Sequence, residues 1–168
     1  MNQQPILDTI LAFLKNKGIP HKLSPIADDC FLPGIMIVDG TLIIDQDKLS
    51  YPGDILHEAG HIAVTAPSER NTLSGKITGS PAEEMAAMAW SYAAAIALDI
   101  DPHIVFHPDG YKGGGAHLAE QYAAEAAGHN VCAPGVPMLQ WFCMTQSFPN
   151  MDQWLRTLDD PTQALPNT

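Results

Sequence analysis

Apolar residues recur at the three- and four-residue spacing of amphipathic helices over several stretches of the chain. Glycine favours helix C-termini, so Gly18 and Gly128 mark the ends of two of these stretches. The chain is therefore predicted to be mainly helical. We expect helices over residues 5–16, 51–64, 80–98, 116–127 and 137–146, with a short amphipathic piece near 151–158.

Residues 35–44 depart from the helical pattern. They form two β-prone runs separated by Asp39-Gly40, the strongest short-range signal for a hairpin. A second short β-prone piece lies between Pro102 and Pro108. We therefore expect the α+β class: a single, mainly helical domain over residues 1–168 with a small antiparallel β-sheet formed around the hairpin.

The helix expected over 51–64 has recognisable ends. Pro52 fits its first turn, and the side chain of Ser50 or Asp54 can accept hydrogen bonds from the free backbone N–H groups there. Pro67 disfavours helical geometry at the residue before it, so the helix should end just ahead of this proline.

Composition and charge restrict the classes of function. The hydrophobic fraction of 46% and the charged fraction of 16% are those of an ordinary folded protein. With 8 basic and 19 acidic residues, the formal charge of −11 would repel a phosphate backbone. We therefore expect no nucleic-acid partner.

The cysteines and the apolar runs indicate a compartment. Cys30, Cys132 and Cys143 are odd in number and contain no C-x-x-C pair, so neither a disulfide framework nor a thiolate zinc site is suggested. The N-terminus lacks the basic and apolar regions of a signal peptide, and the longest apolar run, 85–98, is too short to span a bilayer. We expect a cytoplasmic protein without a membrane segment.

The candidate chemistry lies at residues 57–61, which read H-E-A-G-H, an H-E-x-x-H sequence. Positions i and i+4 share one helix face, so His57 and His61 can present two imidazole nitrogens to one metal ion. Glu58 points about 100° around the helix. That direction suits a general base that takes a proton from a metal-bound water.

An H-E-x-x-H sequence occurs by chance in about one chain of this kind in a hundred, so its context must be weighed. The alternative is a helix in which His57 and His61 are partly buried and satisfy each other or backbone groups. Burying two imidazoles and a carboxylate on one helix is costly unless something pairs them, and a metal would supply that pairing.

A third ligand is expected from the next helix. Ser80 and Glu83 form a capping box with Pro81 between them, and this assigns Glu83 a structural role. Glu84 is then free to turn inward, where a carboxylate needs a partner. We therefore favour Glu84 as the third ligand, and Glu83 stays the alternative.

Further candidates flank the glycine-rich stretch 109–115. Tyr111 and His117 are candidate donors to the oxyanion of a hydrolytic reaction, with Tyr92 and His107 behind them. For each of these the competing interpretation is a surface or core residue. His103 and His107 are also four residues apart, but on a strand they would lie too far apart to share one ion, so we interpret them as structural.

The order of helix, β-hairpin, H-E-x-x-H helix and a further helix with a glutamate resembles the zincin metallopeptidases, in particular the small ImmA/IrrE-type family. The residues that carry the resemblance are the hairpin at 35–44, the motif region 57–63, and Glu84 with the Ala-rich helix after it. Together they span a core over 35–98. The glycine-rich loop and C-terminal helices of 99–168 match no family pattern.

This resemblance implies a zincin-like domain with a Zn2+ ion held by His57, His61 and Glu84. It also implies a β-strand edge beside the cleft, where an extended peptide could add as a further strand. We expect a zinc-dependent peptidase or related amide hydrolase with a peptide or protein substrate. The alternative is a zincin-fold metal-binding or protein-interaction module with little or no turnover.

Overall fold

The computed structural model describes residues 3–27, 32–75 and 80–164. In this part of the chain, α-helices alternate with short strands and 3-10 turns. In chain order they are α1 (Gln4–Asn16), β1 (His21–Leu23), β2 (Ile35–Val38), β3 (Thr41–Ile44), α2 (Gly53–Val64), α3 (Pro67–Arg70), α4 (Pro81–Ala97), the 3-10 turns η1 (Pro102–Ile104) and η2 (Tyr111–Gly113), α5 (Gly115–Ala126), α6 (Val136–Trp141) and the 3-10 turn η3 (Pro161–Ala164).

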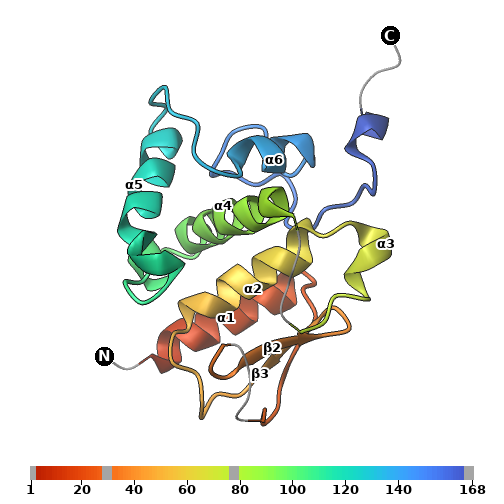
Figure 1. The fold of residues 1–168 in the computed structure, drawn as a ribbon, viewed down its shortest axis with the longest axis vertical. Helices are drawn as coiled ribbons and strands as arrows, with labels where there is room; N and C mark the ends of the chain where they lie inside the picture. The colour runs from red at the N-terminus through yellow and green to blue at the C-terminus, as the bar shows by residue number, and fades with distance from the viewer. Residues whose placement is uncertain (1–2, 28–31, 76–79, 165–168) are drawn as a thin grey trace.

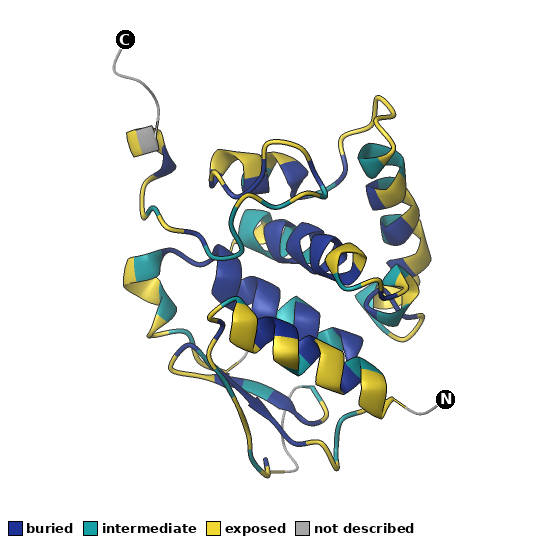
Figure 2. Ribbon diagram, turned by 180° about the vertical axis from the view of Figure 1, so that it is seen from behind, coloured by how far each residue is buried: buried dark blue, intermediate teal, exposed yellow. Residues whose placement is uncertain are grey.

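The elements are stacked in layers (Figure 1). The sheet lies at one end, α1 and α2 lie across it, α4 packs on the other side of α2, and α5 and α6 lie beyond α4. Helices α2 and α4 are the most extensively packed pair, and both are largely buried (Figure 2). The helix that carries the H-E-x-x-H sequence is therefore at the centre of the fold.

The predicted hairpin is confirmed. β2 pairs antiparallel with β3, with Val38 opposite Thr41. Asp39 and Gly40 form the two-residue turn with φ of 48° and 71°. Positive φ at both central residues is what a type I′ turn requires, and this explains why the Asp-Gly pair predicts the hairpin so well.

The expectation of a purely antiparallel sheet is wrong, because a third strand makes the sheet mixed. β1 pairs parallel with β3, giving the strand order β1-β3-β2. Hydrogen bonds flank this pairing: Leu42 N–H donates to Pro20 O at 2.9 Å, and Ser24 N–H donates to Ile44 O at 3.0 Å. With three residues and two of them exposed, β1 carries no alternating apolar pattern by which it could be predicted.

The helices expected over 5–16, 51–64, 80–98 and 116–127 are confirmed as α1, α2, α4 and α5. The capping box is present, with Glu83 N–H donating to Ser80 Oγ and Ser80 N–H donating to the Glu83 carboxylate. Among the described residues, no backbone N–H in the first turn of α2 donates to the side chain of Ser50 or Asp54, so the cap expected there is absent.

Two expectations in the C-terminal half are wrong. The piece between Pro102 and Pro108 is not β but begins as the 3-10 turn η1, which the Asp101 carboxylate caps through the His103 N–H at 3.0 Å. Helix α6 ends at Trp141 rather than near 146, because the backbone reaches φ 57° at Cys143. The amphipathic piece near 151–158 lies in irregular structure.

Two of the observations used to predict the compartment can be checked in the described residues. Among the described residues, no helix is long and apolar enough to cross a membrane. Cys132 and Cys143 are exposed free thiols, and Cys30 lies outside the described residues.

Candidate metal centre

The site forms where α2 and α4 approach each other most closely. A Cβ atom built on Gly60 would lie 2.7 Å from the carbonyl oxygen of Ala87, so only glycine permits this approach. Glu84 is three residues before Ala87, on the same side of α4. The close contact therefore brings the start of α4 against the middle of α2, where His57 and His61 lie.

Three side chains converge on one point between the helices. His57 Nε2 and His61 Nε2 are 3.2 Å apart. His57 Nε2 lies 3.3 Å from Glu84 Oε1, and His61 Nε2 lies 3.2 Å from Glu84 Oε2. The structure thus brings Glu84 to the two imidazoles, while the Glu83 carboxylate is engaged in the capping box.

These distances are those between the corners of a metal tetrahedron. Zinc–nitrogen and zinc–oxygen bonds of about 2.0–2.2 Å at tetrahedral angles separate neighbouring ligand atoms by roughly 3.3–3.6 Å. The three measured separations fall at the lower end of this range or just below it. His57, His61 and Glu84 can therefore hold one small cation with little rearrangement.

Glu58 supplies a second carboxylate. Together with His57 and His61 it forms a group whose candidate ligand atoms all lie within 4.8 Å of one another. Glu84 contacts both imidazoles at 3.2–3.3 Å, so it is the better placed of the two carboxylates to join His57 and His61 around one ion. Two carboxylates beside two neutral imidazoles carry a charge of −2, which a divalent cation would neutralise.

The ionisation of the group reflects this excess of negative charge. The hydrogen bonds from His57 and His61 hold the pKa of the Glu84 carboxyl far below its ordinary value. Burial by itself lowers the pKa of His57, but the hydrogen bond to Glu84 and the charges of Glu58, Glu84 and Asp54 together raise it. The negative charges around His57 thus favour its protonated form, as they would favour a bound cation.

Glu58 has the ionisation expected of a general base. Burial raises the pKa of its carboxyl, and the nearby His57 and His61 offset only part of that rise. A carboxylate with a raised pKa is a better proton acceptor, and it can return the proton to a leaving group.

Among the described residues, the second ring nitrogen of His57 is not paired as it is in most metal-bound histidines. This atom, Nδ1, is buried and has no hydrogen-bond partner in the part of the chain that the structure describes. Metal-bound histidines usually donate this second N–H to a carboxylate or carbonyl. The supporting partner that the sequence left unidentified for His57 is thus not found among the described residues.

Tyr111 is the predicted donor whose ring contacts the His57 ring. Its ring packs edge-on against the His57 ring with centroids 5.6 Å apart, and against Phe106 at 5.0 Å. Burial, followed by the charges of Asp54 and Glu84, raises the pKa of the Tyr111 phenol. The phenol is therefore protonated at neutral pH and can donate a hydrogen bond.

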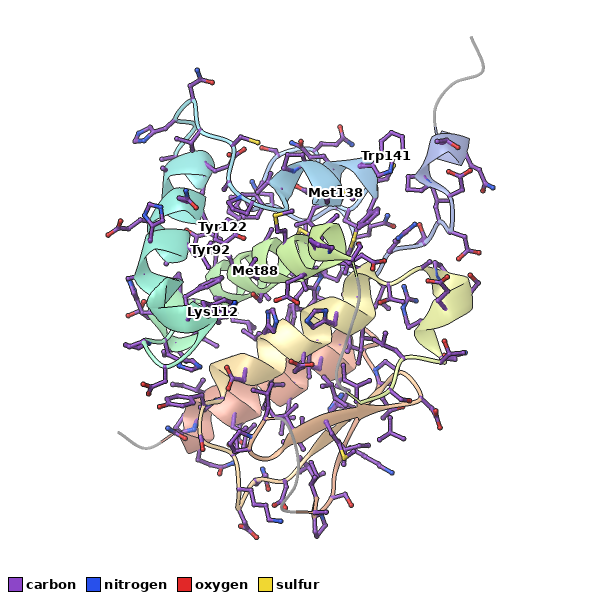
Figure 3. The ribbon with its side chains drawn as sticks, in the orientation of Figure 1. Met88, Tyr92, Lys112, Tyr122, Met138 and Trp141 are labelled. Atoms are coloured by element: carbon purple, nitrogen blue, oxygen red, sulfur yellow. The ribbon has the colours of Figure 1, made fainter. Side chains whose placement is uncertain are left out.

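The other candidates take different positions. His117 is exposed on α5, and no contact joins it to the cluster among the described residues. Tyr92 of α4 belongs to an aromatic group, next to Tyr122 of α5 at a centroid distance of 5.2 Å (Figure 3). The Tyr122 hydroxyl donates to Pro134 O at 2.8 Å.

His107 makes a contact that the sequence did not predict. Its Nε2 lies 2.9 Å from Asp54 Oδ1, one turn before His57 on α2, and its ring stacks on Tyr51. The two partners are 53 residues apart, so no local spacing signals the pair.

The strand edge beside α2 is partly covered. Ile37 O on the outer edge of β2 accepts from Gly75 N–H at 2.8 Å, and Ile35 N–H donates to Leu32 O at 3.3 Å. Two of the backbone groups that an added peptide strand would use are therefore already bonded within the chain.

Comparison of the chain with protein-family models, with curated proteins and with solved structures finds no match in any of the three.

Proposed function

We propose that the protein is a zinc-dependent peptidase or related amide hydrolase of the zincin type. The observation that carries the proposal is the convergence of three side chains: His57 Nε2 and His61 Nε2 are 3.2 Å apart, and each lies 3.2–3.3 Å from one oxygen of the Glu84 carboxylate. Nitrogen and carboxylate donors in this number leave a fourth position open, as in catalytic zinc sites.

Zinc held there would supply an activated water and polarise the carbonyl of a bound amide. Glu58 is within reach to take the proton of that water as its oxygen adds to the carbonyl carbon. The developing oxyanion would accept a hydrogen bond from the Tyr111 phenol. Glu58 then returns the proton to the amide nitrogen, the C–N bond breaks, and a carboxylate and an amine are released.

The resemblance to the ImmA/IrrE-type family supports a peptide or protein as substrate, with the reaction in the cytoplasm. The net charge of −11 argues against a nucleic-acid substrate. Because part of the β2 edge is bonded within the chain, the substrate strand would have to pair beyond Ile37 or displace Gly75 from it.

The test measures zinc binding and hydrolysis separately. Protein purified without a chelator or His-tag is titrated with Zn2+, and hydrolysis of an unstructured protein such as casein is followed for the wild type and for Glu58→Gln. We expect about one equivalent of zinc in both proteins and loss of hydrolysis only in the variant, by a factor of about 100 or more.

If the wild type holds less than about 0.2 equivalents of zinc after zinc addition, the proposed metal site is ruled out, because a site with three protein ligands retains its ion. Full zinc content with equal behaviour of wild type and Glu58→Gln would instead favour the metal-binding or interaction module.

A further inference from the structure

The glycine-rich loop after η1 is tied to the start of α2 at two points. Asp54 Oδ1 lies 2.9 Å from His107 Nε2, and the Tyr51 hydroxyl donates to the Asp109 carboxylate. The Tyr51 ring also lies flat on the His107 ring, with centroids 3.8 Å apart and planes inclined by 10°. His107 is 7% exposed, so one tie is buried.

Between these ties and α5, the loop has a costly backbone conformation. Tyr111, Lys112 and Gly113 have φ of 52°, 54° and 80°, three consecutive residues in the left-handed region. For Tyr111 and Lys112 this conformation is disfavoured by their Cβ atoms. Such a conformation persists only where the surrounding contacts hold it, and it is found most often at functional sites.

The result of this conformation is the position of Tyr111. Its ring is set between Phe106 and His57, whereas Lys112, the next residue, is exposed (Figure 3). Gly110 also packs closely on His107, because a Cβ atom on Gly110 would lie 3.2 Å from His107 Cε1. The loop is thus packed directly on the residue that ties it to α2.

We propose that Tyr51, Asp54 and His107 are positioning residues that hold Tyr111 beside the metal centre. The three residues do not touch the reacting atoms, and they hold Tyr111 in place through the loop. This role rests on the proposed function, since Tyr111 has an oxyanion to serve only if the centre binds a metal and an amide.

A purely structural role is the alternative, and a double-mutant cycle distinguishes the two. A positioning residue loses its effect on ligand binding once Tyr111 no longer carries a hydroxyl, whereas a structural residue acts equally in both backgrounds. His107→Phe is the suitable change, because it keeps a ring against Tyr51 and removes the bond to Asp54. His107→Gln is its matched control, since the amide can still donate to Asp54.

The experiment uses full-length protein loaded with Co2+ and follows the visible absorption of the ion while acetohydroxamic acid is added. The hydroxamate places an oxyanion at the metal, so its affinity reports on a nearby donor. We expect Tyr111→Phe and His107→Phe each to weaken binding about 10-fold, and the double variant to be no weaker than Tyr111→Phe. His107→Gln should recover at least half of the loss on a logarithmic scale.

Each outcome has one consequence. Additive losses of about 100-fold in the double variant, or no loss in His107→Phe, would overturn the positioning role while leaving the metal centre intact. A wild-type protein without a cobalt spectrum would overturn the proposed function, and the positioning role with it. If His107→Phe does not fold, Tyr51→Phe carries the same cycle, with an expected loss of about 3-fold that must vanish in the Tyr111→Phe background.

Discussion

Gly60 packs against the backbone of Ala87, with no room for a methyl group between α2 and α4. The contact falls inside the H-E-x-x-H sequence and three residues beyond Glu84. Packed interiors transmit such displacements because they contain few voids. The separation of the two helices at this point therefore sets the distance from Glu84 to His57 and His61.

Gly60→Ala should weaken zinc binding without changing a ligand. The added Cβ atom would lie 2.7 Å from Ala87 O, and this atom belongs to the backbone, so α4 has to move. We expect a loss of stability of about 1–3 kcal/mol from overpacking, together with a zinc Kd raised at least 10-fold. Zinc affinity is measured by competition with a chromogenic chelator, and stability by denaturant unfolding.

Ala94→Gly is the control for this experiment. Ala94 is buried on α4 and the change costs about 1 kcal/mol in helix propensity, but nothing is pushed toward Glu84. Its zinc affinity should equal that of the wild type. Equal affinities for Gly60→Ala and Ala94→Gly would show that the helix separation does not set the ligand geometry.

Glu84→Gln should weaken zinc binding, whereas Glu83→Gln should lower only the stability of the fold. Glu84 contacts both imidazoles, and its loss as a ligand should weaken zinc binding by at least about 100-fold. Glu83 completes the capping box, so its replacement should cost about 1 kcal/mol of stability or less and leave zinc affinity unchanged. Zinc content after dialysis and thermal unfolding measure the two effects, and the reverse ranking would reassign the ligand to Glu83.

The features that could be predicted from the sequence are those that a few neighbouring residues determine. Asp39-Gly40 defines a turn by its own backbone preferences, and the Ser80–Glu83 pair defines a helix start within four positions. In the structure that cap engages Glu83, while the Glu84 carboxylate lies against His57 and His61. For each of these features, the chemistry of residues close together in the chain was enough to predict the structure.

The features that could not be predicted depend on distant partners. Gly60 has a reason to be glycine only once α4 is known to lie against it. Asp54 has the sequence signature of a helix cap, yet its carboxylate binds His107. β1 pairs with β3 through backbone groups that any residue carries. In all three cases the tertiary packing determines the role, and residue type and spacing do not encode it.

The pH dependence of stability should reverse when zinc binds. In the metal-free protein the raised pKa of His57 means that its proton stabilises the fold below the ordinary histidine value, and this contribution is lost as pH rises through the raised pKa. Zinc displaces that proton, so zinc binding strengthens as pH rises over the same range. As the pH is raised from about 6 to about 8.5, the Tm of the metal-free protein should fall relative to that of the His57→Ala variant. Over the same range, the Tm of the zinc-loaded protein should rise relative to that variant. Parallel curves would show that zinc does not bind at His57.

Two arginines bond the carbonyl groups at the end of α2. Arg70 Nε donates to Ile62 O at 3.0 Å, and Arg70 Nη2 donates to Thr65 O at 3.1 Å. Arg156 donates its backbone N–H to Ala63 O at 2.9 Å, and its Nη1 lies 3.4 Å from Val64 O. Carbonyls at a helix end have no partner within the helix, and a cation there is also favoured by the helix dipole.

Arg156→Lys should therefore destabilise the whole fold although it keeps the charge. Arg156 is buried, donates to Leu158 O and Asp159 O, and stacks on Phe142 with its guanidinium carbon 4.1 Å from the ring centroid. An ammonium group cannot reproduce this planar fork, so buried carbonyls lose their donors. We expect a loss of about 2–3 kcal/mol and a Tm lower by roughly 4–12 °C. Lys15→Met, at an exposed position, serves as the control and should change stability by less than about 0.5 kcal/mol. A Tm of Arg156→Lys equal to the wild type would mean that charge alone, and not the fork geometry, stabilises this end of α2.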